Sequence, residues 1–270
     1  MGIALLVFLI LFLLYLLAIC GRREHPRMKL LQGFHYAHRG LHGNGVPENS
    51  LAAFKAARNR GYGIELDLHL LKDGTLAVFH DSTLIRTTGE EGVIEDLTAE
   101  DLPRYHLEGT DETIPTFEQV LELYGGKAPM IIELKPYRKN HAALAEATCK
   151  ALRGYKGMWC IESFDPRCLL WLKKHRPAVI RGQLSQNFFK SKEKLSPVIK
   201  FLLTNHLLNF LTQPDFLAYR FEHRKHTLSG FFCKKLWKMP FVAWTIRDPE
   251  SHAAAVKEGW LSIFEGFRPL

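Results

Sequence analysis

The chain has 270 residues, a formal net charge of +8 at pH 7, 47% hydrophobic residues and 24% charged residues. This composition is typical of a globular protein and excludes a disordered chain, and the length fits one or two domains. The five cysteines (Cys20, Cys149, Cys160, Cys168 and Cys233) lack CxxC spacing. They favour free thiols in a reducing compartment over a disulfide or zinc framework.

The first segment, Gly2 to Cys20, contains no charged side chain. As a helix it would span about 28 Å, close to the ~30 Å hydrocarbon core of a bilayer. We therefore expect a transmembrane anchor at residues 2–20 and a juxtamembrane linker at residues 21–33. A cleaved signal peptide fits less well, because a basic start and small residues at a cleavage site are missing.

Basic residues follow this apolar segment and none precedes it; they are Arg22, Arg23, Arg27 and Lys29. The positive-inside bias therefore predicts a single-pass membrane protein with the rest of the chain in the cytoplasm. Leu17 to Cys20 loosely resembles a lipidation box, which makes a lipoprotein the alternative. Ile19 argues against it, since a small residue is expected at that position.

Beyond the anchor, apolar runs of strand length alternate with amphipathic stretches of helix length, as in repeated βα units around a parallel sheet. The eight runs are Phe34–His38, Ile64–Leu70, Met130–Leu134, Trp159–Phe164, Val179–Leu184, Phe216–Tyr219, Phe241–Thr245 and Leu261–Phe264. Eight units favour a closed TIM-type (β/α)8 barrel over an open sheet, and such barrels use ~250 residues as one domain. We expect this single α/β domain at residues 34–270.

A long segment, Leu76 to Pro115, separates the second run from the third. It is too long for an ordinary loop between a strand and a helix. Because Leu76–His80 is itself strand-like, we expect a hairpin and a small insertion after the second strand, near the barrel mouth.

Polar residues cluster at the carboxyl ends of the first runs, where TIM-type barrels build active sites. Glu65 and Asp67 are two residues apart on a strand and therefore share one face, and Glu133 adds a third carboxylate from the next run. Like charges on a buried face are unfavourable unless a cation lies between them. Oxygen ligands favour one divalent cation, Mg²⁺ or Ca²⁺. The alternative is neutralisation by Arg39 and Lys135 alone.

His38 and His80 each end a strand-like run. Two imidazoles at one mouth can act as general acid and general base near neutral pH, as cleavage of a phosphodiester requires. Taken singly, either would more often be a structural histidine. Arg39 and Lys135 lie beside these groups, where cations can neutralise phosphoryl oxygens.

Eight short motifs follow one another along the chain: His38–Gly40, Pro47–Ser50, Glu65–Asp67, Phe79–Asp81, Thr83–Gly89, Ile114–Phe117, Glu133–Lys135 and Trp244–Thr245. In order and spacing they resemble the glycerophosphodiester phosphodiesterase family, and the resemblance runs from Ala37 to the C-terminus. It implies a phosphatidylinositol-phospholipase-C-like barrel that hydrolyses glycerophosphodiesters to glycerol 3-phosphate and an alcohol. It also implies metal binding by Glu65, Asp67 and Glu133, acid–base catalysis by His38 and His80, and phosphate contacts from Arg39 and Lys135.

The resemblance is weaker near the C-terminus. Arg247 stands where the family has Asn, and the Asp before the terminal Arg-Pro is replaced within the run Phe264–Pro269. These differences concern the glycerol or alcohol pocket. Its candidate residues are Glu48, Asn49, Phe164 and Trp244, and a core position is the alternative for Trp244.

Two further functions remain as alternatives. The first is phospholipase D-type hydrolysis of lysophospholipids or phosphatidylglycerol at the membrane. The second is a non-catalytic membrane protein that binds phosphate-bearing ligands, against which the intact set of acids and bases argues.

Residues 181–240 carry eleven Lys or Arg and three Asp or Glu, interleaved with pairs of Phe and Leu. This pattern predicts a basic and aromatic surface that an anionic membrane attracts. Ordinary solvated faces of outer barrel helices are the alternative. Because no recognition motif accompanies the charge, we do not expect a nucleic-acid partner.

Overall fold

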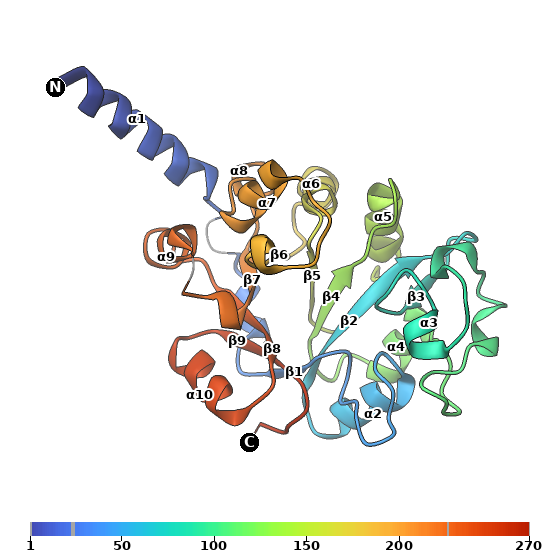
Figure 1. Ribbon diagram of the computed structural model, residues 1–270. Coiled ribbons are helices and arrows are strands. Elements are labelled where there is room, and N and C mark those ends of the chain that lie inside the picture. The colour runs from blue at the N-terminus through green and yellow to red at the C-terminus, as the bar shows by residue number, and fades with distance from the viewer. Residues whose placement is uncertain (1, 23–24, 226, 270) are drawn as a thin grey trace.

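A computed structural model describes residues 2–22, 25–225 and 227–269, so Arg23 of the expected basic cluster lies outside the described residues. Within these ranges, eight parallel strands close into a barrel with helices around it (Figure 1). The strand order is β1-β9-β8-β7-β6-β5-β4-β2, and pairing of β1 with β2 closes the ring. The predicted TIM-type barrel is confirmed.

Each predicted apolar run overlaps one barrel strand. The strands are β1 (His35–Ala37), β2 (Gly63–Leu70), β4 (Met130–Leu134), β5 (Trp159–Ser163), β6 (Arg181–Ser185), β7 (Phe216–Arg220), β8 (Phe241–Ile246) and β9 (Leu261–Phe264). Successive side chains of a strand point to opposite faces. Leu66 and Leu68 therefore pack outward among helix residues such as Phe54, whereas Ile131 and Val242 fill the barrel interior.

The helices connect these strands on the outside of the barrel. They are α2 (Leu51–Asn59), α3 (Ile85–Thr88), α4 (Phe117–Tyr124), α5 (His141–Ala151), α6 (Pro166–His175), α7 (Pro197–Thr204), α8 (Asn209–Thr212), α9 (Leu228–Lys235) and α10 (Pro249–Lys257). Short 3-10 turns are η1 (Met28–Leu31), η2 (Ile94–Asp96), η3 (Leu102–Arg104), η4 (Phe188–Lys190) and η5 (Phe221–His223). Several helices begin at a capping side chain; at α4, Thr116 and Gln119 form a capping box.

The segment after β2 forms the expected hairpin and insertion. Strand β3 (Leu76–Val78) pairs antiparallel with β2, and Leu68 faces Val78. The insertion has its own apolar cluster, which includes Leu84 and Ile94. It is tied to the barrel mouth through Arg86, which binds the carboxylates of Asp81 and Glu48.

The apolar N-terminal segment forms α1 (Gly2–Ala18), which projects away from the barrel (Figure 1). Among the described residues, no helix is both long enough and apolar enough to cross a membrane. The predicted transmembrane span at residues 2–20 is therefore not supported by the helix that forms. All five cysteines have free thiols, as expected.

The residues after α1 cover the amino-terminal end of the barrel. Arg22 forms a two-point pair with Asp215, with Nε–Oδ1 and Nη2–Oδ2 distances of 2.5 and 2.6 Å. Met28 and Leu31 are buried in the interior cluster, and Tyr36 Oη donates a hydrogen bond to the Leu31 carbonyl at 2.6 Å. Arg22, Met28 and Leu31 of the expected linker thus pack on the barrel at the end opposite its mouth.

Candidate active site

The turn after β1 brings His38 and Arg39 to the barrel mouth. Arg39 has a φ of 52° and Gly40 a φ of 81°, so two successive residues adopt the left-handed conformation. A Cβ at Gly40 would lie 2.8 Å from Ala53 Cβ, so both the conformation and the close approach of α2 require glycine here. The geometry of this turn therefore explains why glycine follows His38 and Arg39.

The three expected carboxylates come together inside the barrel. Glu65 and Asp67 project from β2, and Glu133 faces Asp67 across the β2–β4 pairing. All three are buried, and one carboxylate oxygen of each lies within 4.8 Å of the others. The geometry groups the predicted metal ligands as the sequence suggests.

Burial and mutual repulsion oppose the ionisation of this cluster. Burial, followed by the charges of Asp67 and Glu133, raises the pKa of Glu65 well above its usual range. Lys135 Nζ lies 3.1 Å from Asp67 Oδ1 and 2.7 Å from Glu133 Oε1. Burial alone would raise the pKa of Asp67, but Lys135 and other nearby cations outweigh burial and lower it well below its usual range.

The donor set fits a hard divalent cation. Asp67 Oδ1 is buried and accepts no hydrogen bond of regular geometry, although the Lys135 ammonium lies 3.1 Å away. Burial also raises the pKa of Glu133, although Lys135 partly offsets the effect. Three buried carboxylates whose mutual repulsion is unfavourable are the environment that an oxygen-bound Mg²⁺ or Ca²⁺ relieves.

Arg39 and its neighbours support the carboxylates from one side. The Arg39 backbone N–H donates to Glu65 Oε2 at 3.0 Å, and Nη1 donates to Glu48 Oε1 at 2.8 Å. Asn49 Nδ2 donates to Asp67 Oδ2 at 2.9 Å. Glu48 and Asn49 thus hold the arginine and a carboxylate, and they do not line the cavity at the mouth. These two candidate pocket residues are placed behind its wall.

Phe164 and Trp244, the other two candidates, line the cavity itself. Their rings meet edge to face with centroids 5.5 Å apart. Leu184 and Ile263 also line it, so an apolar wall faces the charged groups. Such a cavity suits a ligand with a polar end and a less polar end.

Both candidate catalytic histidines line this cavity, and each is held by a carboxylate. Glu265 Oε2 lies 2.6 Å from His38 Nδ1, and Asp81 Oδ1 lies 2.6 Å from His80 Nδ1. A carboxylate at Nδ1 favours the tautomer with the proton on that nitrogen, which leaves Nε2 as the acceptor. Burial lowers the pKa of His38 to about 4, although the hydrogen bond with Glu265 opposes the effect.

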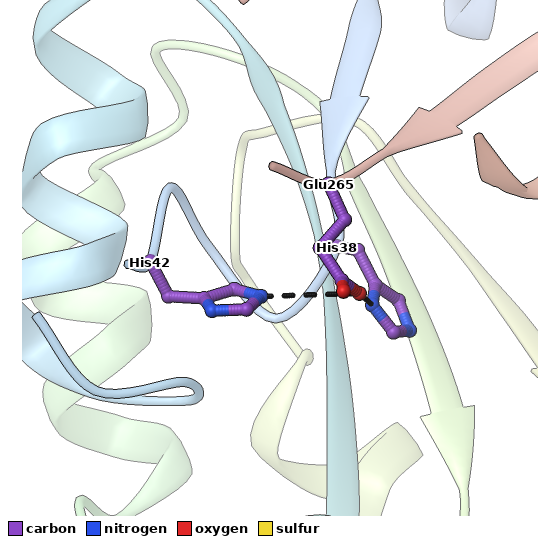
Figure 2. Close-up of side chains that lie close together, drawn as sticks. All are labelled: His38, His42 and Glu265. Atoms are coloured by element: carbon purple, nitrogen blue, oxygen red, sulfur yellow. Dashed lines mark hydrogen bonds and ion pairs between the residues drawn. The ribbon is translucent and has the colours of Figure 1, made fainter. Parts of the chain in front are cut away.

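Glu265 was not among the predicted site residues. Figure 2 shows its carboxylate between the imidazoles of His38 and His42. Its Oε2 is 4.0 Å from His42 Nε2, and its carboxylate also accepts from Arg247 at 3.2 and 3.4 Å. The only sequence signal was its place in the run that departs from the family pattern.

Glu162 is a second residue that the sequence analysis missed. It lies on β5 directly opposite Glu133, is buried, and lines the cavity. Burial, followed by repulsion from Glu133, raises the pKa of Glu162 well above its usual range. A glutamate inside the fourth apolar run was the available signal.

His69 and Glu95 support the loop that carries His80. His69 Nδ1 lies 2.6 Å from Glu95 Oε1, and its Nε2 lies 3.1 Å from the carbonyl oxygen of His80. Both side chains are buried. The insertion therefore contributes a hydrogen-bonded support for one of the two histidines.

A family model described as the glycerophosphoryl diester phosphodiesterase family matches residues 38–264. A glycerophosphodiester phosphodiesterase of Caldanaerobacter subterraneus subsp. tengcongensis is 39% identical over 160 residues, which cover 56% of this chain and 65% of that protein. One of Bacillus altitudinis is 44% identical over 107 residues, which cover 37% of this chain and 43% of the relative. The match thus spans less than two thirds of either relative.

Among solved structures, an Oleispira antarctica phosphodiesterase in complex with the product sn-glycerol-3-phosphate superposes with a TM-score of 0.70 at 24% identity. The match covers 86% of this chain and 92% of that chain. At this level of identity, the likeness supports the barrel fold.

Proposed function

The chain belongs to the glycerophosphoryl diester phosphodiesterase family, and from this premise we propose that it hydrolyses a glycerophosphodiester to glycerol 3-phosphate and an alcohol. One observation carries the proposal. Two imidazoles, each held by a carboxylate, share one cavity with Arg39, Lys135 and the carboxylate cluster.

In the proposed reaction, His38 and His80 carry out the proton transfers. Hydrolysis of a phosphodiester requires one group to remove a proton from the nucleophile and another to protonate the leaving alcohol. His38 and His80 form this pair, with Glu265 and Asp81 holding the Nδ1 atoms. Because burial keeps His38 neutral at physiological pH, its Nε2 is a free acceptor there.

The charges in the cavity suit a phosphoryl group. Arg39 and Lys135 line it together with the carboxylates. Their cations neutralise phosphoryl oxygens and the charge that grows on them in the transition state. When bound by Glu65, Asp67 and Glu133, one Mg²⁺ or Ca²⁺ would add Lewis-acid neutralisation of the same charge.

A lysophospholipid is the second substrate class that the cavity favours. Phe164, Leu184 and Trp244 supply apolar lining to the cavity. An acyl-bearing substrate would place apolar groups there, whereas a glycerophosphodiester of a polar alcohol gains less from it.

We also propose that α1 attaches the protein to a membrane with the barrel on the cytoplasmic side. Its Leu, Ile and Phe side chains are exposed along most of its length, which is unfavourable in water. Arg27 and Lys29 follow it, in agreement with the positive-inside bias. Sedimentation of the full chain with membranes after a carbonate wash tests this attachment.

The decisive assay is release of glycerol 3-phosphate by the full chain in mild detergent. The substrates are glycerophosphocholine, glycerophosphoethanolamine, glycerophosphoglycerol and lysophospholipids, with Mg²⁺ or Ca²⁺ added separately. The His80→Ala variant should lose release, whereas His106→Ala, which removes an exposed histidine of the insertion, should keep it. Absence of glycerol 3-phosphate from the glycerol diesters, or release of a phosphorylated alcohol instead, would contradict the proposal. Hydrolysis of lysophospholipids would instead release a lysophosphatidate and would identify lysophospholipids as the substrate class.

A further inference from the structure

Exposed apolar side chains concentrate on one flank of the barrel. Beyond residue 30, the described part of the chain exposes eleven large apolar side chains, and nine of them lie between residues 189 and 236. They belong to η4, α7, α8, α9 and the residue after α9, and include Phe201, Phe210 and Phe231. Scattered apolar residues are normal on a protein surface, but a concentration on adjacent elements indicates an interaction surface. We call η4, α7, α8 and α9 the apolar flank.

The apolar flank is continuous with α1, which leaves the barrel between α8 and α9 (Figure 1). The rings of Phe12 and Phe232 meet edge to face at 5.7 Å. Asn209 Nδ2 of α8 donates to the Ile19 carbonyl at 3.1 Å, and Trp237 Nε1 donates to the Leu16 carbonyl at 3.1 Å. The end of α1 is therefore fixed between these helices, and its exposed apolar surface adjoins that of the flank.

Basic side chains accompany the apolar ones. Lys192 and Lys194 follow η4, and Lys235 ends α9; all three are exposed. Within the described residues, none of the three forms an ion pair with a carboxylate. Their positive charge repels a second copy of the same surface and attracts an anionic one.

A pocket beside α9 has the same combination of chemistry. Phe241 and Trp260 form part of its apolar wall, while Arg224, Lys225 and Lys234 lie around it together with one acid, Glu258, which pairs with Arg224. Trp260 Nε1 is buried without a hydrogen-bond partner. An amphiphile with an anionic headgroup matches these surroundings, which a polar protein surface does not.

The flank also reaches the mouth of the barrel. Phe188 of η4 packs edge to face on Phe164 with centroids 6.1 Å apart. Phe164 in turn packs on Trp244, and both line the catalytic cavity. Apolar contacts therefore run from the flank to the edge of the site.

We propose that the apolar flank is an interfacial surface that lies on an anionic lipid bilayer. Aromatic and aliphatic side chains of α7, α8 and α9 enter the headgroup boundary, and the lysines contact anionic headgroups. The proposal assumes that α1 is held by the same bilayer, and it is independent of the reaction catalysed. It predicts that the barrel rests on its flank with the cavity at the membrane surface.

Single tryptophan substitutions in the full chain test the contact, with the fluorescence quenching of each variant taken relative to that of the parent, which has five tryptophans of its own. Phe201→Trp reports on the flank, Val256→Trp on an exposed site of α10 outside it, and Leu9→Trp on α1. The three parent side chains are 53%, 52% and 51% exposed, so the probes start from matched environments. Each variant is reconstituted in vesicles with brominated acyl chains, about one third of them anionic phosphatidylglycerol.

Quenching of Phe201→Trp should exceed that of Val256→Trp by about twofold or more, because side chains of an interfacial helix lie ~5–10 Å into the boundary. This excess should fall in high salt, in neutral vesicles, and in a Lys192→Ser, Lys194→Ser, Lys235→Ser background. Quenching of Leu9→Trp should not change with these conditions. Thermal unfolding of each variant verifies that the barrel is intact.

Equal quenching at Phe201→Trp and Val256→Trp, with Leu9→Trp quenched, would overturn the flank proposal and leave α1 as the sole attachment. Loss of quenching at all three would contradict the membrane attachment of α1 as well. If the excess quenching at Phe201→Trp does not depend on lipid charge, the proposed role of the lysines is wrong. Self-association that protects Phe201→Trp without lipid would assign the flank to a second copy of the chain.

Discussion

The two ends of the barrel bury charge in opposite ways. At the amino-terminal end, Asp215 accepts from two nitrogens of Arg22 and from the backbone N–H of Arg181 at 2.9 Å. Arg22 also donates to the Val179 carbonyl, and Arg181 Nε donates to that of Thr212. The Asp215 carboxylate and the Arg22 guanidinium at this end are thus paired with each other and with backbone groups, whereas Arg181 Nη1 is buried without a hydrogen-bond partner.

At the mouth, like charges face one another. Glu65, Asp67, Glu133 and Glu162 are all buried there, and burial raises the pKa of three of them. Lys135 compensates part of the charge through Asp67 and Glu133. Carboxylates arranged in this way oppose folding.

The contrast between the two ends of the barrel distinguishes residues that stabilise the fold from residues that serve the reaction. A buried ion pair that is fully hydrogen-bonded tolerates no loss of one partner, whereas a buried carboxylate with a raised pKa, such as Glu65 or Glu162, can lose its charge at little cost in stability. Mutations at the amino-terminal end should therefore reduce stability and leave turnover per folded molecule unchanged. Mutations of Glu65, His38 or His80 at the mouth should instead reduce turnover per folded molecule and leave stability near that of the parent.

The largest effect is expected at the carboxylate cluster. Asp67→Asn or Glu65→Gln should abolish turnover, by about 10³-fold or more, because the cation and its charge neutralisation are lost. Urea unfolding of Glu65→Gln should show little loss of stability, whereas Asp67→Asn should lose some because it removes an ion-pair partner of Lys135. EDTA should inactivate the parent reversibly. Asp111→Asn, at an exposed acid of the insertion, serves as the control. Full activity of either mouth variant in saturating chelator would exclude the metal site.

A loss of stability is expected from Arg22→Gln. The change leaves the Asp215 carboxylate, whose side chain is 1% exposed, without its guanidinium partner, which should reduce the free energy of unfolding by roughly 3 kcal/mol. Arg104→Gln makes the same substitution in a surface pair whose arginine side chain is 76% exposed, and it should change stability by less than about 1 kcal/mol. Equal losses in urea unfolding of the two variants would contradict the contrast between buried and surface pairs.

The catalytic histidines should affect turnover and leave stability near that of the parent. His38→Ala or His80→Ala should lower kcat by at least ~10²-fold, and the parent should show a bell-shaped pH profile. Since the two groups act as a unit, the double variant should be little worse than the worse single variant. Strictly additive losses, or a single variant with the pH profile of the parent, would argue against an acid–base pair.

The sequence predicted the barrel because each strand is a short apolar run between amphipathic stretches. This local pattern is enough to locate the strands and helices. The residues grouped at the mouth follow strand ends, so fold class alone brings His38, Glu65 and Glu133 together. Contacts across the closed ring have no local signature. Glu265 meets His38 from the residue after the last strand, 227 positions away in the chain, and Glu162 becomes a neighbour of Glu133 only through strand pairing. The packing of Arg22, Met28 and Leu31 on the barrel was missed for the same reason.

The effect of Glu162→Gln on stability should depend on pH. The raised pKa means that folded Glu162 keeps its proton above pH 4.5, where the unfolded chain releases it. The folded state then binds more protons than the unfolded state, so the parent loses stability as pH rises. Because the glutamine of the variant cannot titrate, the unfolding free energy of the variant should exceed that of the parent by a margin that grows by up to about 1.4 kcal/mol per pH unit. Urea unfolding in EDTA from about pH 5 to about pH 8 measures the margin. Glu100→Gln, at an exposed glutamate, should track the parent at every pH. If the unfolding free energies of Glu162→Gln and the parent instead change with pH in parallel, Glu162 ionises in the folded barrel as it does in water. That outcome would contradict the contrast in buried charge between the mouth and the amino-terminal end.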